Sequence, residues 1–231
     1  VDNVIAVWPD HTDASKKHSL AWWIDWLNGE EATIRIPKGT HEILNDITIP
    51  DNICLQFDKG GILKVAATKT LTINGAIEAK AWQIFDGNGA VAGVPKVDAI
   101  YVEWFGAKGD GITDSTSAIQ KACDWAENIR KTFTVGVHPI VTAASGQYLV
   151  SNTIQIKSSC ALSHIRIIAD GTAVSPAVRI GYNEDLKKLA TAEIDAPAVV
   201  NYKNGAIVSS WVNSGIGIEL CNLDQCKVYV P

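Results

Sequence analysis

Acidic residues in the last third of the chain are the side chains best suited to do chemistry. A carboxylate can act as a general acid or base when it lies on an element next to a second carboxylate. None of these residues stands in a recognisable catalytic motif, and solvated turn residues are the plainer interpretation. The candidate catalytic residues are Asp170, Glu219 and Asp224, with Glu193 and Asp195 in the same group.

Tryptophan is the second residue type with binding potential, since the chain contains 8 of them. Packing accounts for most of these side chains, and we expect Trp22 and Trp211 to be the most exposed. An exposed indole with polar neighbours is a surface on which a sugar ring can stack. These two residues are therefore the candidate carbohydrate-binding positions.

Composition excludes several classes of protein. The net charge is −5, and a broad nucleic-acid surface would need a basic stripe, so we expect no nucleic-acid partner. No apolar run approaches the roughly 18 residues of a membrane span, so no membrane insertion is expected. The 5 cysteines include no CxxC pair and the 5 histidines are scattered, which predicts no disulfide framework and no metal site.

The two ends of the chain suggest a fragment. The sequence contains no methionine, and strand-like residues 216–230 run up to Pro231 without a polar cap. We therefore expect the natural chain to continue beyond residue 231.

Two segments have the periodicity of amphipathic helices. The first covers residues 13–28, with Asp13 as its N-cap and Gly29 after its end. The second covers residues 114–128, with Asp114 as its N-cap. The expected apolar stripe of the second helix consists of Ala118, Ile119, Ala122, Cys123 and Ala126.

Most of the other residues form short apolar segments separated by Gly, Asn, Asp or Pro. Strands this short are typical of a solenoid, in which each coil adds one short strand to each face. The expected strands are 33–36, 47–49, 53–57, 62–65, 71–73, 83–85, 148–150, 154–156, 165–167, 178–180, 206–208, 216–220 and 227–230.

The two halves of the sequence resemble each other at an offset of 107 residues. In both halves a Thr-Asp pair precedes the helix, and a glycine-centred turn and an Ile-x-Ile strand follow it. This pattern predicts a duplicated unit whose copies stack on one core. The matched positions are Gly39, Ile43, Asn45, Ile47 and Ile49 with Gly146, Val150, Asn152, Ile154 and Ile156.

The segment 103–122 has the most distinctive sequence. Glycines permit a tight turn, and its aspartates can accept backbone N–H bonds there and at the start of the helix. A phosphate-binding loop is disfavoured, because the glycine order fits neither standard motif and a carboxylate would face the anion. The structural motif residues are Gly106, Gly109, Asp110, Gly111, Thr113 and Asp114.

From Phe105 to Ala122 this segment closely resembles the opening motif of the pectate-lyase-like superfamily, FGAKGDGxTDxTxAIQxA. The wider resemblance covers roughly residues 31–170 and includes phage tailspikes and pre-neck appendages. It implies an all-β fold, a right-handed parallel β-helix with two short capping helices. We place a lead-in domain at residues 1–100 and the start of the main β-helix at 101–231.

The resemblance also implies a function and partners. Polysaccharide is the expected partner, and a homotrimer on a phage tail or a secreted or cell-surface protein is the expected setting. Family members cleave by hydrolysis or by elimination, and a lyase could use Ca²⁺; no other cofactor is expected. Two readings stay open: a protein that binds and degrades or modifies polysaccharide, and a non-catalytic segment of a tail or surface fibre.

Overall fold

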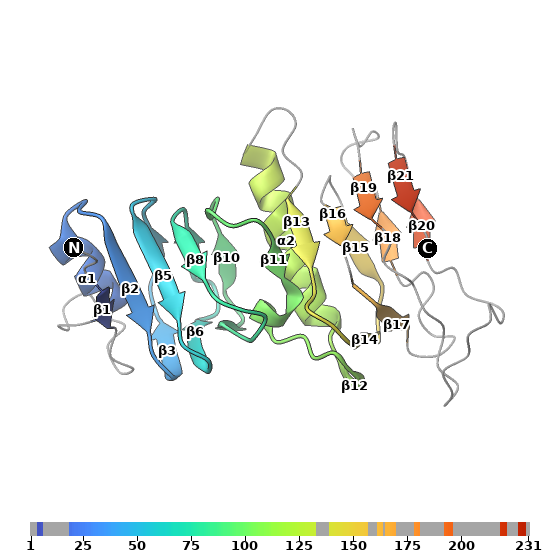
Figure 1. The fold of residues 1–231 in the computed structure, drawn as a ribbon, viewed down its shortest axis with the longest axis horizontal. Helices are drawn as coiled ribbons and strands as arrows, with labels where there is room; N and C mark the ends of the chain where they lie inside the picture. The colour runs from blue at the N-terminus through green and yellow to red at the C-terminus, as the bar shows by residue number, and fades with distance from the viewer. Residues whose placement is uncertain are drawn as a thin grey trace. The chain divides into compact units, whose positions relative to one another are not determined.

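The computed structural model describes residues 4–6, 19–132, 139–156, 161–163, 165–169, 178–180, 192–195, 218–220 and 226–229. The chain divides into two compact units, Val1–Val97 and Asp98–Pro231, each built mainly of parallel strands (Figure 1).

The first unit contains one helix and ten strands among its described residues. They are β1 (Val4–Ala6), α1 (Leu20–Leu27), β2 (Ala32–Ile36), β3 (Gly39–Ile43), β4 (Ile47–Ile49), β5 (Ile53–Phe57), β6 (Gly61–Val65), β7 (Thr70–Ile73), β8 (Ala76–Glu78), β9 (Phe85–Gly87) and β10 (Ala90–Ala92).

These strands form three parallel sheets, ordered β1-β2-β5-β8, β3-β6-β9 and β4-β7-β10. From β2 onward, paired residues lie 20 to 24 positions apart in the sequence. Each turn of the chain thus adds one strand to each sheet, and the next turn stacks on it in register. This is the arrangement of a parallel β-helix.

Alternation along each strand places apolar side chains in the core of the first unit. Ile34, Leu55 and Ile77 are register partners on three successive strands and are at most 8% exposed. Burying one such side chain stabilises a fold by about 1.5–3 kcal/mol. His41 occupies an inward position of the second sheet, and its Nε2 lies 2.9 Å from the Pro37 carbonyl oxygen.

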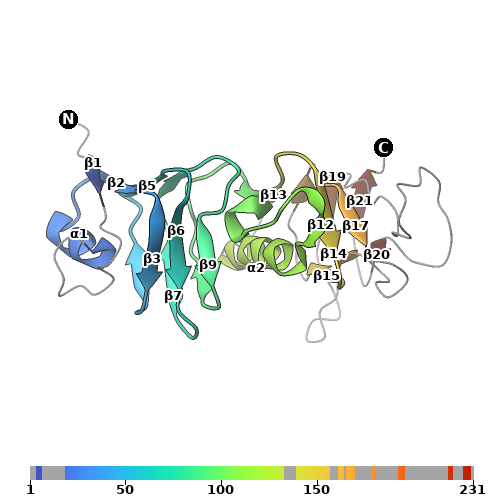
Figure 2. The same cartoon turned by 90° about the horizontal axis from the view of Figure 1, so that it is seen from below.

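Helix α1 lies beside β1 and β2 in both views (Figures 1 and 2). It begins at Leu20, because the Ser19 hydroxyl accepts the Trp22 N–H at 3.0 Å as an N-cap. Helix α1 therefore begins seven residues after the predicted start at Asp13, and Asp13 itself lies outside the described residues. At the other end, Asn28 takes a left-handed conformation (φ 45°) and ends the helix before Gly29, as predicted.

The second unit contains one α-helix, one 3₁₀ helix and eleven strands among its described residues. They are β11 (Ile100–Tyr101), η1 (Val102–Phe105), β12 (Asp110–Asp114), α2 (Thr116–Thr132), β13 (Ile140–Thr142), β14 (Gln147–Val150), β15 (Ile154–Ile156), β16 (Ala161–Ser163), β17 (Ile167–Ala169), β18 (Val178–Ile180), β19 (Ala192–Asp195), β20 (Ile218–Leu220) and β21 (Cys226–Tyr229).

These strands also form three parallel sheets, ordered β11-β13-β16-β19-β21, β12-β14-β17 and β15-β18-β20. The second and third coils each give one strand to each sheet: β13, β14, β15 and then β16, β17, β18. In the first coil, helix α2 follows β12 where the later coils have a strand of the third sheet. Helix α2 contacts η1, β11, β13 and β15, so it covers the first strand of that sheet.

The apolar stripe predicted for the second helix is confirmed. All five of its residues are buried, and Trp125 is buried with them at 1% exposure. The helix runs to Thr132, four residues past the predicted end at Asn128, and starts at Thr116 instead of Asp114.

Some strands begin at a different residue from the predicted one, because pairing with a neighbouring strand determines where they start. Residues 83–85 were predicted as a strand, but β9 starts at Phe85, where the chain pairs with Leu63 of β6. Likewise the strand predicted at 165–167 is β17, which pairs from Ile167 with Tyr148. Within the segment where a tight turn was expected, residues 110–114 form β12, and the register of its pairing with β14 shifts between Asp110 and Asp114. The strand predicted at 206–208 lies outside the described residues.

The positions matched at an offset of 107 residues take equivalent elements. Gly39 and Gly146 both have positive φ angles, 139° and 119°. Gly39 opens β3 and Gly146 directly precedes β14, and each of these strands is followed by an Ile-x-Ile strand, β4 or β15.

Two of the cysteines with described side chains differ in exposure. Cys123 is buried, whereas Cys54 is half-buried. Burial, together with the nearby Glu78 carboxylate, raises the pKa of the Cys54 thiol to about 11. This thiol is therefore protonated and unreactive near neutral pH.

Candidate functional site

The glycine-rich segment before α2 is held in a tight conformation by Asp110. Its Oδ1 accepts the N–H groups of Ile112 and Thr113 at 2.9 and 2.7 Å, and its Oδ2 accepts the Thr113 hydroxyl at 2.7 Å. Gly106 and Gly111 take positive φ angles of 92° and 69° on either side. The bonds from Thr113, and then that from Ile112, lower the pKa of Asp110 to about 2. This carboxylate shapes the turn and stays ionised.

Gly109 and Gly146 allow two chain segments to approach closely. A Cβ atom on Gly109 would lie 2.5 Å from the Ser145 carbonyl oxygen, and one on Gly146 would lie 2.3 Å from the Gly109 carbonyl oxygen. Neither distance is possible for a real side chain. The backbone contact is completed by the Gln147 N–H, which donates to the Gly109 carbonyl at 3.1 Å.

Asp114 joins the start of α2 to the residue after β14. Its Oδ1 accepts the Thr116 N–H at 2.9 Å and the Thr116 hydroxyl at 2.5 Å, and its Oδ2 accepts the Ser151 hydroxyl at 2.6 Å. The Ser151 N–H donates to Thr116 Oγ1 at 2.9 Å. Burial alone would raise the pKa of Asp114, but these hydrogen bonds lower it overall. Asp114 is therefore ionised and already occupied, which makes it a poor proton donor.

The Gln120 side chain forms hydrogen bonds with the backbone of β15, along the edge where this strand has no neighbouring strand in its sheet. Its Oε1 accepts the Gln155 N–H and its Nε2 donates to the Gln155 carbonyl oxygen, both at 2.8 Å. A neighbouring strand would satisfy the same two backbone groups. The Asp124 carboxylate accepts a further bond from Gln120 Nε2 at 2.8 Å and orients the amide. An edge strand with free N–H and C=O groups can pair with another chain, and this amide blocks that pairing.

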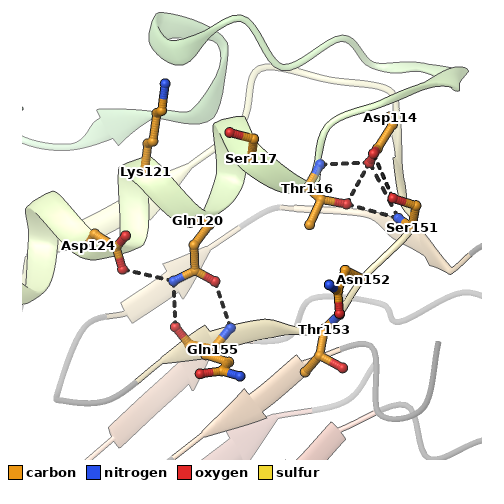
Figure 3. Close-up of a pocket in the computed structure, with 10 residues that line it drawn as sticks. All are labelled: Asp114, Thr116, Ser117, Gln120, Lys121, Asp124, Ser151, Asn152, Thr153 and Gln155. Atoms are coloured by element: carbon orange, nitrogen blue, oxygen red, sulfur yellow. Dashed lines mark hydrogen bonds between the residues drawn. The ribbon is translucent and has the colours of Figure 1, made fainter. Parts of the chain in front are cut away.

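An open groove of about 630 Å³ runs between α2 and β15 (Figure 3). Gln120 points toward β15, whereas Lys121 points away from it. Every lining residue has a hydroxyl, amide, carboxylate or amine group in its side chain. The lining residues are Asp114, Thr116, Ser117, Gln120, Lys121, Asp124, Ser151, Asn152, Thr153 and Gln155.

The groove is built for hydrogen bonding more than for acid–base catalysis. Asp124 follows Thr116 by eight residues, about 12 Å along the helix axis. Hydrolases of glycosidic bonds hold their two carboxyl groups only about 5–9.5 Å apart. The backbone of Asp124 therefore already lies farther than this range from the first residue of the helix. Hydroxyl and amide side chains are well suited to bind the hydroxyl groups of a sugar.

A buried carboxylate, Glu103, joins η1 to the chain around the start of β14. Glu103 is 8% exposed, and its Oε1 accepts the Ala144 N–H at 2.9 Å and the Tyr148 hydroxyl. Burial, with the charge and hydrogen bond of Glu103, raises the pKa of Tyr148. The pair ties η1 to the segment between β13 and β14. Sequence reasoning missed this contact, since its partners lie 45 residues apart.

The acidic residues proposed as catalytic lie on two different sheets or outside the described residues. Glu193 and Asp195 lie in β19, and Glu219 lies in β20, which belongs to a different sheet. Asp170 and Asp224 lie outside the described residues. Among the described residues, no group of three or more His, Cys, Asp or Glu side chains could hold a metal ion.

The tryptophan prediction needs a correction. Trp22 was predicted to be exposed but is half-buried. Trp26, which was not predicted to be exposed, has 61% of its surface exposed. Leu20 and Leu27 are the buried residues of the helix, and Trp26 lies about 100–120° around the helix axis from them. Trp211 lies outside the described residues. No helix in the described ranges is long and apolar enough to cross a membrane.

Comparison with known proteins supports the resemblance over one part of the chain. A protein-family model described as rhamnogalacturonase A/epimerase, pectate lyase-like, matches residues 99–163. No solved structure matches the chain significantly. The matched segment contains the glycine-rich turn, α2 and all the groove residues. Residues 99–163 are therefore similar to a pectate lyase-like domain, and the stacked parallel sheets agree with the β-helix expected from that similarity.

Proposed function

We propose that this protein binds polysaccharide through the groove between α2 and β15. The observation that carries the proposal is the position of this polar groove inside the segment that resembles pectate lyase-like domains. Its hydroxyl and amide groups can exchange hydrogen bonds with sugar hydroxyls along an open path. A ligand that is itself extended suits an open groove better than a small molecule, which is bound in an enclosed pocket.

The finer proposal is a tailspike-like protein with a right-handed, internally duplicated β-helix. In it, polysaccharide is cleaved or modified by hydrolysis or elimination. The right hand is the one found in nearly all parallel strand crossovers. We further propose a homotrimer located on a phage tail, or a secreted or cell-surface protein. Sedimentation at micromolar concentration tests the assembly, and a monomer would contradict it.

A non-catalytic segment of a tail or surface fibre is the second candidate. It is favoured because both carboxylate oxygens of Asp114 already accept hydrogen bonds from Thr116 and Ser151, so this groove carboxylate has a structural role. Incubation with acidic and neutral polysaccharides separates the two candidates. New reducing ends indicate hydrolysis, and reducing ends with an unsaturated, ultraviolet-absorbing product indicate elimination. Binding without either product supports the fibre.

A bulky substitution that fills the groove tests whether the groove is the binding site. Ser117 is an exposed groove residue of α2, and Asn128 is an exposed residue of the same helix that does not line the groove. We expect Ser117→Tyr to weaken retardation in polysaccharide-containing gels and Asn128→Tyr to leave it unchanged. Equal retardation of both variants and the parent protein would contradict the groove as the binding site.

A further inference from the structure

The outer face of α1 carries an aromatic surface that belongs to neither the groove nor the core. Trp22 and Trp26 stand four residues apart on this helix, with ring centroids 6.2 Å apart and planes inclined by 17°. Trp23 meets both edge-on, at 4.8 and 5.4 Å. The three indoles therefore form one block, defined here as the indole platform (Trp22, Trp23 and Trp26).

The helix holds this platform in a fixed orientation. At 3.6 residues per turn, Trp22 lies about 140–160° and Trp26 about 100–120° around the helix axis from Leu20 and Leu27. Those two leucines are buried at 2% and 4% exposure, so the platform faces away from the core of the first unit. The N-cap at Ser19 fixes the helix start. A rigid aromatic side chain contributes binding area at low entropic cost.

The packing of the platform decides which ligand it fits. Ring separations of 4.8 to 6.2 Å are direct contacts between aromatic rings, so no space is left among the indoles for a quaternary ammonium group. The free surface is the outer face of Trp26, which is 61% exposed. A flat apolar face of this kind matches the C–H face of a pyranose ring.

Acidic residues that neighbour the platform in the sequence restrict the class of sugar that it can bind. Asp25 lies in the same helix, and Glu30 and Glu31 follow it within five residues of Trp26; all three are exposed. Like charges near a binding surface repel a polyanion. Polymers of uronic acids are therefore disfavoured, and uncharged sugar rings are favoured.

We propose that the indole platform stacks on a neutral hexopyranose ring of the polysaccharide, with Trp26 as the main contact. This inference rests on the proposed function, because it names the chemical class of the sugar that the protein binds. The platform acts as a second contact point, separate in sequence from the groove residues.

Affinity gel electrophoresis of the 231-residue chain tests the proposal. The gels contain dextran, a neutral glucan, or polygalacturonate, a polymer of uronic acid. We expect retardation in a gel with neutral polysaccharide and about tenfold weaker binding by Trp26→Ala, the size of effect expected when a stacked aromatic contact is lost. Leu44→Ala is the matched control, since Leu44 is an exposed apolar residue (49%) of the same unit with no part in the platform.

The outcomes separate this inference from the proposed function. Binding of neutral polysaccharide that Trp26→Ala leaves unchanged overturns the platform while keeping the proposed function. Stronger, Trp26-dependent binding of polygalacturonate overturns the neutral class of ligand. No binding of either polymer, with Trp26→Ala changing only self-association in sedimentation, overturns both the platform's ligand and the proposed function. Thermal unfolding of each variant checks that the exposed substitutions leave the fold intact.

Discussion

Gln120 provides a sharp test of how α2 covers the end of the third sheet. Its side-chain amide forms two hydrogen bonds of 2.8 Å with the backbone of Gln155 in β15. The change Gln120→Ala removes both bonds and leaves the N–H and C=O groups of a half-buried strand residue without this partner. The helix itself should persist, because alanine is the strongest helix former.

The expected loss of stability follows from these two bonds. An intramolecular hydrogen bond contributes about 0.5–1.5 kcal/mol net, so the pair contributes about 1–3 kcal/mol. The higher helix propensity of alanine offsets a few tenths of a kcal/mol. The net destabilisation of the strand edge is therefore about 0.7–2.7 kcal/mol. The bond from Gln120 to Asp124 is exposed and adds little.

Hydrogen exchange of the Gln155 amide measures this effect at the site itself. Since about 1.4 kcal/mol corresponds to tenfold, exchange should become about 3- to 85-fold faster in Gln120→Ala. Asn128→Ala is the control, as Asn128 is an exposed residue of the same helix. If the Gln155 amide exchanges equally fast in both variants, the amide does not substitute for a neighbouring strand and the reasoning is refuted.

Gln120→Glu adds a second, pH-dependent test. At neutral pH the carboxylate would face two acceptors, the Gln155 carbonyl and the Asp124 carboxylate, and could no longer donate to either. Its pKa in the folded protein should therefore lie above the ordinary value of about 4.3. Stability should then be recovered as the pH falls and the group becomes protonated, and lost as the pH rises through the folded pKa. Stability that falls in parallel with the parent protein on acidification would contradict this account.

Three other substitutions test the turn and its support. Because the pKa of Asp110 is lowered to about 2, its ionised form stabilises the fold above about pH 4, and this contribution is lost as the pH falls through 2. Asp110→Asn should therefore flatten the change in urea midpoint between pH 4 and pH 2; an unchanged slope argues against the Asp110 turn. Tyr148→Phe removes the hydroxyl that donates to buried Glu103, so we expect a loss of about 1–3 kcal/mol in urea unfolding, and Tyr148→Phe with Glu103→Gln should recover part of it. Gly146→Ala forces a Cβ to 2.3 Å from the Gly109 carbonyl and should cost at least about 2 kcal/mol, whereas Ser145→Ala, at an exposed neighbour, should cost less than about 0.5 kcal/mol.

Local pattern was enough for much of the fold. Strands β4, β5, β15 and β18 lie where the apolar alternation predicted them, and the buried stripe of α2 is the predicted one. These elements are determined by which side chains must leave water, and that information is carried by neighbours in sequence. The motif at residues 105–122 added the parallel stacking, which periodicity alone does not specify.

Pairing between distant segments decided what the sequence pattern left open. Strand β12 is polar and glycine-containing, and it is a strand only because β14 lies beside it. Strand β9 starts where Phe85 meets Leu63, not where the apolar run starts. In both cases the partner is more than 20 residues away, so no local signal marks the boundary.

The candidate site shows the same division. From sequence alone, Asp110 and Asp114 were expected to accept backbone N–H bonds at a tight turn and a helix start, since short acidic side chains next to glycine do this locally. The groove, the pairing of Gln120 with Gln155 and the outward position of Trp26 were decided by tertiary structure. The groove and the Gln120 pairing depend on which strand α2 covers, and the exposure of Trp26 depends on which side of α1 packs on the core; both are settled by contacts between segments far apart in the chain.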